Sequence, residues 1–329
     1  MECYNADKDN EGRNDMDIYS IGEMVIDFIP GEKNGEYIRN AGGAPANVAI
    51  AAARNGLETG MCCKVGNDDF GRFLIDTLQK ERVKVICDNL CDEAITTMAF
   101  VSLAENGERT FTFARKPGAD MFLRISDVKE SDIEASTIIH AGSCSLSAEP
   151  VASATRKALQ YGHQKDKIVS FDINYRNLMW NDDKEKCARA VKEILPYVSI
   201  LKISEEEVDM VGGEENIKDL MNENELTTVV LTLGSEGAKV FFRDKVFSVK
   251  GKKVKAVDAT GAGDAFWGGF LSSLRIQGVN KAADITEEIF KKAMEYGNYS
   301  GALCVQKKGA ISSLPTRDEI EELIRSNAL

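Results

Sequence analysis

The second half of the chain alternates short apolar runs with amphipathic segments. Four apolar runs occupy residues 136–143, 167–173, 198–204 and 228–234 (STIIHAGS, KIVSFDI, VSILKIS and TVVLTLG). Each run is short and apolar at most positions, as strands are when both faces of a sheet are buried. Segments with helical spacing separate them, such as VASATRKALQYG and KEKCARAVKEIL. The pattern predicts an α/β fold with a central, mostly parallel sheet and helices on both of its faces.

The first third of the chain does not show this alternation. Residues 17–29 (DIYSIGEMVIDFI) predict one buried strand, and residues 41–56 predict a glycine-rich turn into a helix with Pro45 at its first position. Residues 95–115 form two alternating runs around the turn residues 105–108, which is typical of a hairpin. We therefore predict a small β lid, formed by about residues 28–41 and 94–119 and inserted in the α/β domain.

The two ends of the chain differ in their sequence patterns. Residues 1–15 are polar and acidic, which excludes a signal peptide or anchor and predicts a disordered tail before one domain over residues 16–329. At the other end, Thr316 precedes Glu319 by three positions, which predicts a capping box that opens a final helix.

Composition narrows the class of protein. The 329 residues carry a net charge of −12, which argues against nucleic acid or an anionic membrane as the main partner. No apolar stretch approaches the roughly 18–20 residues that a membrane span needs. The eight cysteines form no CxxC pair, so we expect buried free thiols and a cytoplasmic protein. Of the two histidines, His140 lies in an apolar run and is interpreted as a core residue, which argues against a histidine-based triad or metal site.

The stretch DATGAGDAFWGGF carries the clearest chemistry. Gly261, Ala262 and Gly263 would expose backbone N–H groups at the start of a helix, where an anion binds. The stretch matches neither a Walker A motif nor a GxGxxG turn. Asp264 puts a carboxylate beside this anion site, and phosphoryl transfer gives that carboxylate a role. It would orient the acceptor hydroxyl and take its proton, while the neighbouring N–H groups neutralise the phosphate.

A second glycine turn, AGGAPANVA, offers groups for a polyol. Gly42 and Gly43 would let a sugar approach the backbone, and Asn47 supplies a donor and an acceptor. Asp27, at the end of the first predicted strand, offers two acceptors for neighbouring hydroxyls. These residues predict a sugar site.

AGGAPANVAIAAARNG and DATGAGDAFWGGF resemble the two signatures of the ribokinase-like (PfkB) sugar kinases, in the same order. Five further strings agree with this resemblance, which covers about residues 17–329: GNDDFG, FDINYR, KISEEE, LTLGSEGA and KKGAISSLP. The resemblance implies a ribokinase-like sheet with a β lid that closes over the sugar. It also implies transfer of the γ-phosphate of ATP to a primary hydroxyl.

The resemblance also implies roles for individual residues. It makes Asp264 the catalytic base, with an anion hole at Gly261, Ala262 and Gly263. Sugar-binding positions fall on Asp27, Gly42, Gly43 and Asn47. Nucleotide-binding positions fall on Thr232, Gly234, Gly237 and Asn298. Glu207 matches the acid that organises Mg²⁺ through water, although Ser204 stands where the family usually has asparagine. A candidate K⁺ site falls on Asp258, Thr260, Cys304, Lys307, Gly309 and Ser313.

The sugar itself is left between two main alternatives. The glycine turn and the strings RTFTFARKPGADMFL and FDINYRNLMW resemble fructokinases, which favours phosphorylation of fructose to fructose 6-phosphate. Arg115 and Arg176 would bring two cations to the sugar site, which keeps a 2-keto-3-deoxygluconate kinase as the alternative. Ribokinase and a non-catalytic regulatory relative are less favoured. The exposed edges of the predicted lid also make a lid-mediated homodimer a candidate assembly.

Overall fold

The computed structural model describes residues 16–31, 33, 35–87, 89–103 and 109–326. Among these residues, nine strands form the main sheet in the order β15-β14-β13-β12-β11-β10-β1-β4-β6. Their bounds are β1 (Met16–Ile21), β4 (Thr59–Cys62), β6 (Val83–Val85), β10 (Ser136–Gly142), β11 (Ile168–Asp172), β12 (Ile200–Ser204), β13 (Thr228–Thr232), β14 (Gly237–Phe242) and β15 (Lys245–Lys250). All neighbours from β13 to β6 pair in parallel, and only the pairs made by β14 are antiparallel. The prediction of a mostly parallel central sheet is confirmed.

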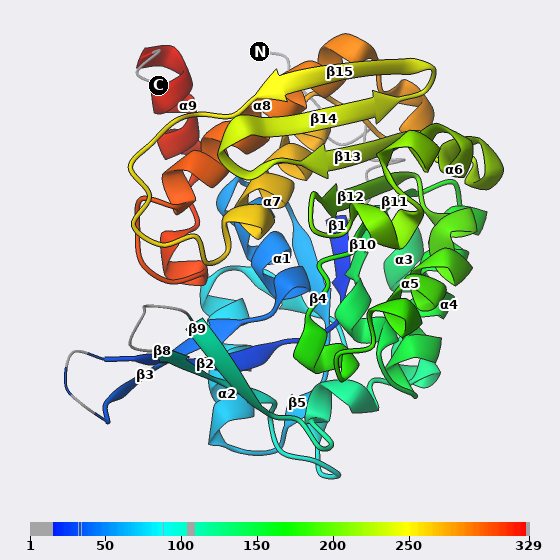
Figure 1. Cartoon of the computed structure of the whole chain (residues 1–329). Coiled ribbons are helices and arrows are strands. Elements are labelled where there is room, and N and C mark those ends of the chain that lie inside the picture. Colours follow the sequence, from blue (N-terminus) through cyan, green and yellow to red (C-terminus); the bar gives the residue numbers. More distant parts are fainter. Residues whose placement is uncertain (1–15, 32, 34, 88, 104–108, 327–329) are drawn as a thin grey trace, which may run out of the picture.

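Helices cover both faces of the main sheet, as Figure 1 shows. One face carries α1 (Ala44–Arg54), α2 (Asp69–Lys80), α7 (Ala262–Ile276) and α8 (Glu287–Cys304), with α9 (Arg317–Ser326) packed on α8. The other carries α3 (Glu130–Glu134), α4 (Val151–Gln164), α5 (Lys184–Ile194) and α6 (Ile217–Asn224). Successive strand residues point to opposite faces: Ile138 packs in the cluster of Trp267, whereas Ile139 packs in the cluster of Leu159. Burial on both faces explains why the strands read as continuous apolar runs.

The glycine pair of the FWGGF string fixes the position of α7 between α1 and α8. A Cβ on Gly268 would lie 2.5 Å from the Cβ of Ala51 in α1. A Cβ on Gly269 would lie 2.7 Å from the Cβ of Ser300 in α8. Because no side chain separates the helix backbones at these positions, the three helices pack closely and hold the start of α7 in place.

A second sheet, at the lower left of Figure 1, contains four strands within the described residues, in the order β3-β2-β8-β9. Its strands are β2 (Val25–Pro30), β3 (Tyr37–Gly42), β8 (Met98–Leu103) and β9 (Arg109–Ala114). We call this sheet the lid. The last described pairing, β5 (Val65–Gly66) with β7 (Leu90–Cys91), lies beside it. The turn residues 105–108 and the predicted tail 1–15 lie outside the described residues.

The expectation of one buried strand over residues 17–29 is wrong. β1 ends at Ile21 and pairs within the main sheet, whereas β2 begins at Val25 and pairs with β3 and β8 in the lid. Asp27 consequently lies inside β2 of the lid and not at the end of the first strand. The apolar pattern continues across the break because residues 18–26 are all buried, so periodicity alone does not reveal the change of sheet.

Several local predictions are confirmed. The runs with helical spacing are α4 and α5, whereas Pro45 is the second residue of α1 and not the first, because α1 begins at Ala44. The Thr316 hydroxyl accepts from the Glu319 N–H, and the Glu319 carboxylate accepts from the Thr316 N–H, which is the capping box of α9. The seven described cysteines are buried and free, whereas Cys3 lies outside the described residues. His140 is buried and hydrogen-bonded to Ser170, and burial lowers its pKa to about 3.

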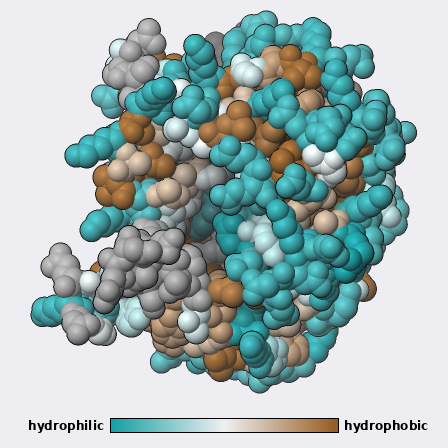
Figure 2. All heavy atoms as spheres, viewed as in Figure 1, coloured by the Kyte–Doolittle hydropathy of each residue, from teal (hydrophilic) through white to brown (hydrophobic). Residues whose placement is uncertain are grey.

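The surface is mainly polar. Hydrophilic residues dominate the face in Figure 2, and hydrophobic residues there occur in small groups. Within the described part of the chain, none of the helices combines the length and apolar character that a membrane crossing requires.

Candidate active site

Two cavities meet at the start of α7, above the carboxyl ends of the parallel strands, where ligands bind in open α/β sheets. The first, of about 500 Å³, lies beside the lid and is lined by Asp27, Asn47, Arg176, Gly261 and Asp264 among others. The second, of about 600 Å³, is lined by Thr232, Gly234, Gly237, Ala262, Gly263 and Asn298 among others. Ala259 lines both. We call them the lid cavity and the glycine cavity.

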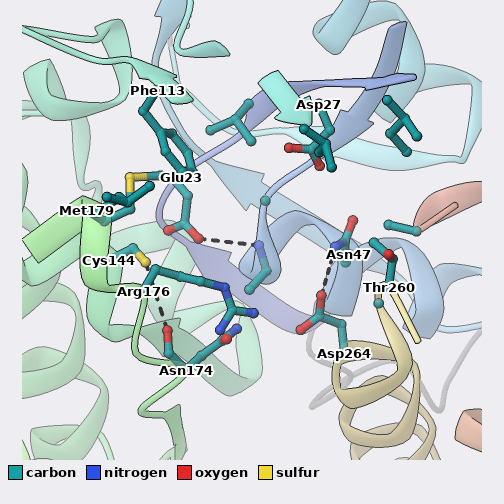
Figure 3. Close-up of a pocket in the computed structure, with 18 of the residues that line it drawn as sticks. Glu23, Asp27, Asn47, Phe113, Cys144, Asn174, Arg176, Met179, Thr260 and Asp264 are labelled. Atoms are coloured by element: carbon teal, nitrogen blue, oxygen red, sulfur yellow. Dashed lines mark hydrogen bonds between the residues drawn. The ribbon is translucent and has the colours of Figure 1, made fainter. Parts of the chain in front are cut away.

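Asp264 lies in the first turn of α7 and faces the lid cavity (Figure 3). Its side chain is 7 % exposed, and its Oδ2 accepts a hydrogen bond of 2.8 Å from Nδ2 of Asn47 in α1. Burial raises the pKa of Asp264 to about 6, and the nearby carboxylate of Asp172 adds to the rise, while Asn47, Arg176 and Lys202 oppose it. The carboxyl therefore loses its proton near neutral pH, as a general base must.

The same turn of α7 presents backbone donors. Gly261 adopts a φ of 76° just before the helix, and no side chain caps the helix start. The early N–H groups of a helix have no partner within it and carry the positive end of its dipole. This helix start therefore presents backbone N–H donors between the cavities, with Asp264 at its side.

Asp27 and Arg176 lie on the walls of the lid cavity. Burial raises the pKa of Asp27 to about 6, although Arg176 lowers it in part. Arg176 is exposed, but to the cavity, where its guanidinium donates only to the Tyr175 carbonyl among the described hydrogen bonds. Gly43 lines the cavity as well, and Gly42 lies directly behind Asp27, since a Cβ on Gly42 would be 2.1 Å from Oδ2 of Asp27.

The glycine cavity is built mainly from backbone and small side chains. Gly237 adopts a φ of 101°, and a Cβ there would lie 2.1 Å from the carbonyl oxygen of Val249. Only glycine therefore fits at this position of the turn. Thr232 donates to the Ile203 carbonyl and Asn298 donates to the Lys250 carbonyl, so both side chains are fixed in the wall.

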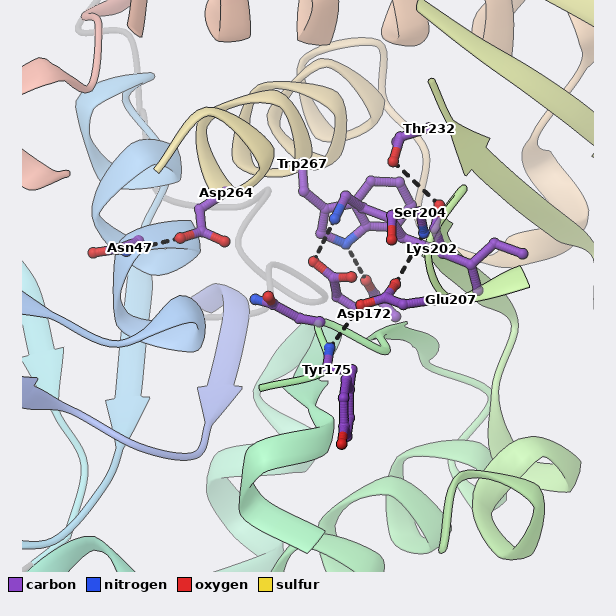
Figure 4. A network of polar contacts seen from close by, with 12 residues as sticks. Asn47, Asp172, Tyr175, Lys202, Ser204, Glu207, Thr232, Asp264 and Trp267 are labelled. Atoms are coloured by element: carbon purple, nitrogen blue, oxygen red, sulfur yellow. Dashed lines mark hydrogen bonds and ion pairs between the residues drawn. The ribbon is translucent and has the colours of Figure 1, made fainter. Parts of the chain in front are cut away.

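A buried polar network joins the two cavities (Figure 4). Nζ of Lys202 lies 2.6 Å from Oδ2 of Asp172, and the two side chains are 8 % and 3 % exposed. Burial opposes the charge on Lys202, but the carboxylates of Asp172, Glu207 and Asp264 raise its pKa, so it stays protonated. A Cβ on Gly263 would lie 3.6 Å from this ammonium. The network therefore places a fixed positive charge under the anion site.

Glu207 could organise a magnesium ion. Its Oε1 accepts from the Tyr175 N–H at 2.6 Å, and its Oε2 accepts from the Ser204 N–H at 2.9 Å. These bonds hold the carboxylate in a hollow that runs between the two cavities. No cluster of three or more His, Cys, Asp and Glu side chains within the described residues is arranged to hold a metal ion. A single oriented carboxylate nevertheless fits Mg²⁺, which usually keeps several waters and takes its other ligands from phosphates.

The candidate K⁺ residues converge in two adjacent loops beside α7. Asp258 accepts from the N–H groups of Thr260 and Gly309, and Sγ of Cys304 lies 3.0 Å from Oγ of Ser313. The loops thus bring carbonyl, hydroxyl and carboxylate oxygens together, which suits a hard cation. The side chain of Lys307 turns away to pair with Glu319, so only its backbone could contribute.

Arg115 does not lie at the sugar site, where the sequence analysis placed it. It lines neither cavity and forms an ion pair of 2.7 Å with Asp120, in which the two side chains are 7 % and 2 % exposed. Asp120 follows Arg115 closely in the chain, and the partnership is decided by the turn between them, which the sequence pattern does not reveal.

Three further site residues were missed from the sequence, namely Lys202, Asp172 and Glu23, the last of which also lines the lid cavity. The sequence did contain an indication of Lys202 and Asp172. Each is a charged residue in the last part of an apolar strand, and β11 and β12 are neighbours in a parallel sheet, so their carboxyl ends meet. Glu23 lies in the link between β1 and β2, a link that the single predicted strand concealed.

Comparisons with known proteins agree with this geometry. Fructokinase-1 of Oryza sativa is 36 % identical over 96 % of this chain and 99 % of its own length. A crystal structure of fructokinase from Xylella fastidiosa with bound ATP superposes with a TM-score of 0.87 at 28 % identity, over 95 % of this chain and 99 % of that one. A fructokinase structure from Vibrio cholerae with fructose, ADP and calcium gives 0.83 at 34 %, over 94 % and 99 %. The model of the pfkB family carbohydrate kinases matches residues 15–317. The chain therefore belongs to the pfkB family of carbohydrate kinases.

Proposed function

We propose that this chain is an ATP-dependent fructokinase that forms fructose 6-phosphate. The observation that carries the proposal is the position of the start of α7, with the carboxyl of Asp264 in the lid cavity and the backbone of Gly263 in the glycine cavity. Transfer of a phosphoryl group needs a hydroxyl and a phosphate on opposite sides of one anion site. In this arrangement the sugar occupies the lid cavity and the nucleotide occupies the glycine cavity.

The residues divide the work of the transfer. Asp264 accepts the proton of the sugar hydroxyl, and Asn47 holds its carboxylate in position. The N–H groups of Gly261, Ala262 and Gly263, with Lys202 behind them, stabilise the negative charge on the moving phosphoryl group. Asp27 and Asn47 bind sugar hydroxyls at the wall formed by β2 and α1.

Two cations complete the proposal. Glu207 holds Mg²⁺ through water, and the ion when bound neutralises phosphate charge during transfer. The loops that contain Asp258, Thr260, Cys304, Lys307, Gly309 and Ser313 hold K⁺ beside the anion site. A bound cation there would stabilise the loop that leads into α7.

The charge in the lid cavity favours a neutral sugar. Three carboxyl side chains line it, those of Glu23, Asp27 and Asp264. Arg176 is the only arginine or lysine among the described lining residues. A sugar acid such as 2-keto-3-deoxygluconate would bring a fourth carboxylate, whereas fructose brings only hydroxyls, which can donate to carboxylates.

The arrangement of the chain supports four further proposals. One kinase domain spans residues 16–329, and the lid over the first cavity closes when sugar binds, which would exclude water. The lid also offers a face for a second copy of the chain, because Tyr37 and Ile38 on its edge strand β3 are 44 % and 53 % exposed. The free, buried cysteines suit a reducing compartment, and we place the activity in the cytoplasm.

The experiment is an ADP-release assay of the purified chain with fructose, ribose, 2-keto-3-deoxygluconate, tagatose and adenosine. The Asp264→Asn variant, measured in parallel, gives the rate in the absence of the proposed base. We expect fructose to give the highest kcat/KM. A clear preference for the keto acid would replace fructose by that substrate. ATP binding without turnover on any of these compounds would favour the regulatory relative.

A further inference from the structure

Glu23 lines the lid cavity on the side away from Asp264. It sits in the link between β1 and β2, where the chain passes from the main sheet to the lid. Figure 3 shows its carboxyl beside Cys144 and Met179, with Asp264 and Asn47 at the opposite end of the cavity. The residue is 5 % exposed and lines the cavity. The catalytic and sugar-binding roles assigned above belong to other lining residues, so Glu23 has no assigned role.

The two oxygens of this carboxyl differ. Oε1 accepts a hydrogen bond of 3.3 Å from the N–H of Ala44, the first residue of α1. Oε2 is buried and has no hydrogen-bond partner among the described residues. Buried polar atoms are nearly always hydrogen-bonded, so this oxygen is suited to accept a hydrogen bond from a bound ligand. Since the residue borders the cavity that holds the proposed substrate, a substrate hydroxyl is the natural partner.

The charged neighbours of Glu23 lie behind it. Burial raises the pKa of Glu23 to about 7, the carboxylate of Asp120 adds to this rise, and the guanidinium of Arg115 opposes it. Arg115 is itself committed to its ion pair with Asp120. Close to neutral pH the carboxyl is therefore present in both forms, and either form can bond to a hydroxyl, which donates and accepts.

We propose that Oε2 of Glu23 binds the hydroxyl group at the end of the sugar remote from the reacting hydroxyl, and that this contact selects a neutral hydroxymethyl end over a carboxylate. The inference rests on the proposed function, because it takes the hydroxyl beside Asp264 as the one that is phosphorylated. In fructose that reacts at C6, the remote group is the C1 hydroxymethyl. In 2-keto-3-deoxygluconate it is the C1 carboxylate.

The selection follows from charge and hydrogen bonding. A carboxylate of the substrate beside ionised Glu23 would bring two like charges together in a partly closed cavity, which is unfavourable. A hydroxymethyl group meets the same oxygen as a donor and forms a charge-assisted hydrogen bond. A site built to bond a hydroxyl also rejects an analogue that lacks it, because its buried polar atom then stays unpaired.

The test pairs a change in the protein with a change in the sugar. The variant is Glu23→Gln, which keeps an acceptor for the Ala44 N–H but removes the charge at Oε2. The two substrates are fructose and 1-deoxyfructose, which differ by the C1 hydroxyl. Glu58→Gln serves as the matched control, because Glu58 is exposed and lies outside the lid cavity.

The readout is the ratio of the KM for 1-deoxyfructose to the KM for fructose. We expect roughly a tenfold ratio in the wild type and in Glu58→Gln, and at most about threefold in Glu23→Gln, the loss expected for one charged hydrogen bond. The kcat for fructose should stay within about threefold, because the contact is remote from the reacting atoms. The relative use of 2-keto-3-deoxygluconate should rise in Glu23→Gln alone.

The possible failures are distinguishable. Each ratio compares two sugars on one folded protein, so a general loss of stability in the variant cancels from it. Preference for fructose with an unchanged ratio in Glu23→Gln overturns the role of Glu23 and leaves the proposed function standing. A wild type that prefers 2-keto-3-deoxygluconate overturns the proposed function itself, together with the selection assigned to Glu23.

Discussion

The lid cavity and the glycine cavity share the start of α7 but are built from different parts of the chain. The lid cavity is lined by three acids, Glu23, Asp27 and Asp264, and by apolar side chains of β2, β8 and β9. The glycine cavity is lined largely by glycine, alanine and backbone, with Lys252 and Lys253 at its side. Side chains can distinguish one sugar from another, whereas exposed N–H groups suit the phosphates that all nucleotides share. The contrast places substrate choice in the lid cavity and phosphate binding at the helix start.

The largest effect should come from the residue that serves the sugar side of the shared helix. Asp264→Asn keeps the size of the side chain but removes the proton acceptor, so kcat should fall by roughly 10²–10⁴-fold. ATP affinity, measured by titration calorimetry, should change little because the glycine cavity is intact. The exposed Asp318→Asn in α9 is the control. Near-normal turnover in Asp264→Asn would remove the residue from the chemistry.

Lys202 lies on the border between the two cavities, and its loss should damage both. Lys202→Met leaves Asp172 buried without its partner, which should lower the free energy of unfolding by about 3–5 kcal/mol. Chemical denaturation measures this change. Lys192→Met on the exposed face of α5 should leave stability almost unchanged. If the Lys202 and Lys192 variants unfold at the same denaturant concentration, the buried pair contributes nothing to the fold.

Arg176 should matter to the sugar side alone. Arg176→Ala removes a charged hydrogen-bond donor from the lid cavity, which should weaken fructose use by about 1.5–3 kcal/mol in kcat/KM. The KM for ATP should stay nearly constant, and the exposed Arg189→Ala in α5 should change neither constant. A wild type that prefers the keto acid, together with loss of that preference in Arg176→Ala, would show that the arginine serves a substrate carboxylate.

The two cavities should also differ in how the strands around them respond to a bound ligand. If the lid closes over sugar, amide hydrogens in β8 and β9 should exchange more slowly with fructose present, whereas ATP alone should change them little. Strands β14 and β15 of the main sheet provide the internal reference, because they lie outside the lid. Hydrogen exchange followed by mass spectrometry measures this. Exchange in β8 and β9 that is indifferent to fructose would contradict closure on the sugar side.

The smallest effect is set by pH. Asp264 has a pKa raised to about 6, and below this value it holds a proton and cannot accept one. The kcat/KM for fructose should therefore fall by about half at pH 6 and roughly tenfold at pH 5, because Asp264 becomes protonated. ATP binding should not follow the same curve. A flat profile between pH 7 and 5 would mean that no group with this pKa takes part.

The two cavities also differ in how much of each could be predicted from the sequence. The helix start at Gly261 is one contiguous string whose chemistry follows from backbone alone, whereas the turn at Gly237 was assigned only through the family resemblance. The wall of the lid cavity is assembled from segments far apart in the chain. Glu23 was missed because two buried strands read as one, and Lys202 with Asp172 required the strand order. Arg115 was misplaced because the fold of a short loop decides which way its guanidinium points.

The central claim is that the start of α7 divides a sugar side from a nucleotide side. A crystal structure of Asp264→Asn with fructose and a non-hydrolysable ATP analogue tests it most directly, because the variant should bind both without turnover. The account predicts fructose in the lid cavity, with a primary hydroxyl within hydrogen-bond distance of residue 264. It also predicts the terminal phosphate of the analogue on the N–H groups of Gly261 to Gly263. Fructose bound elsewhere, or an analogue whose phosphates point away from the helix start, would contradict it.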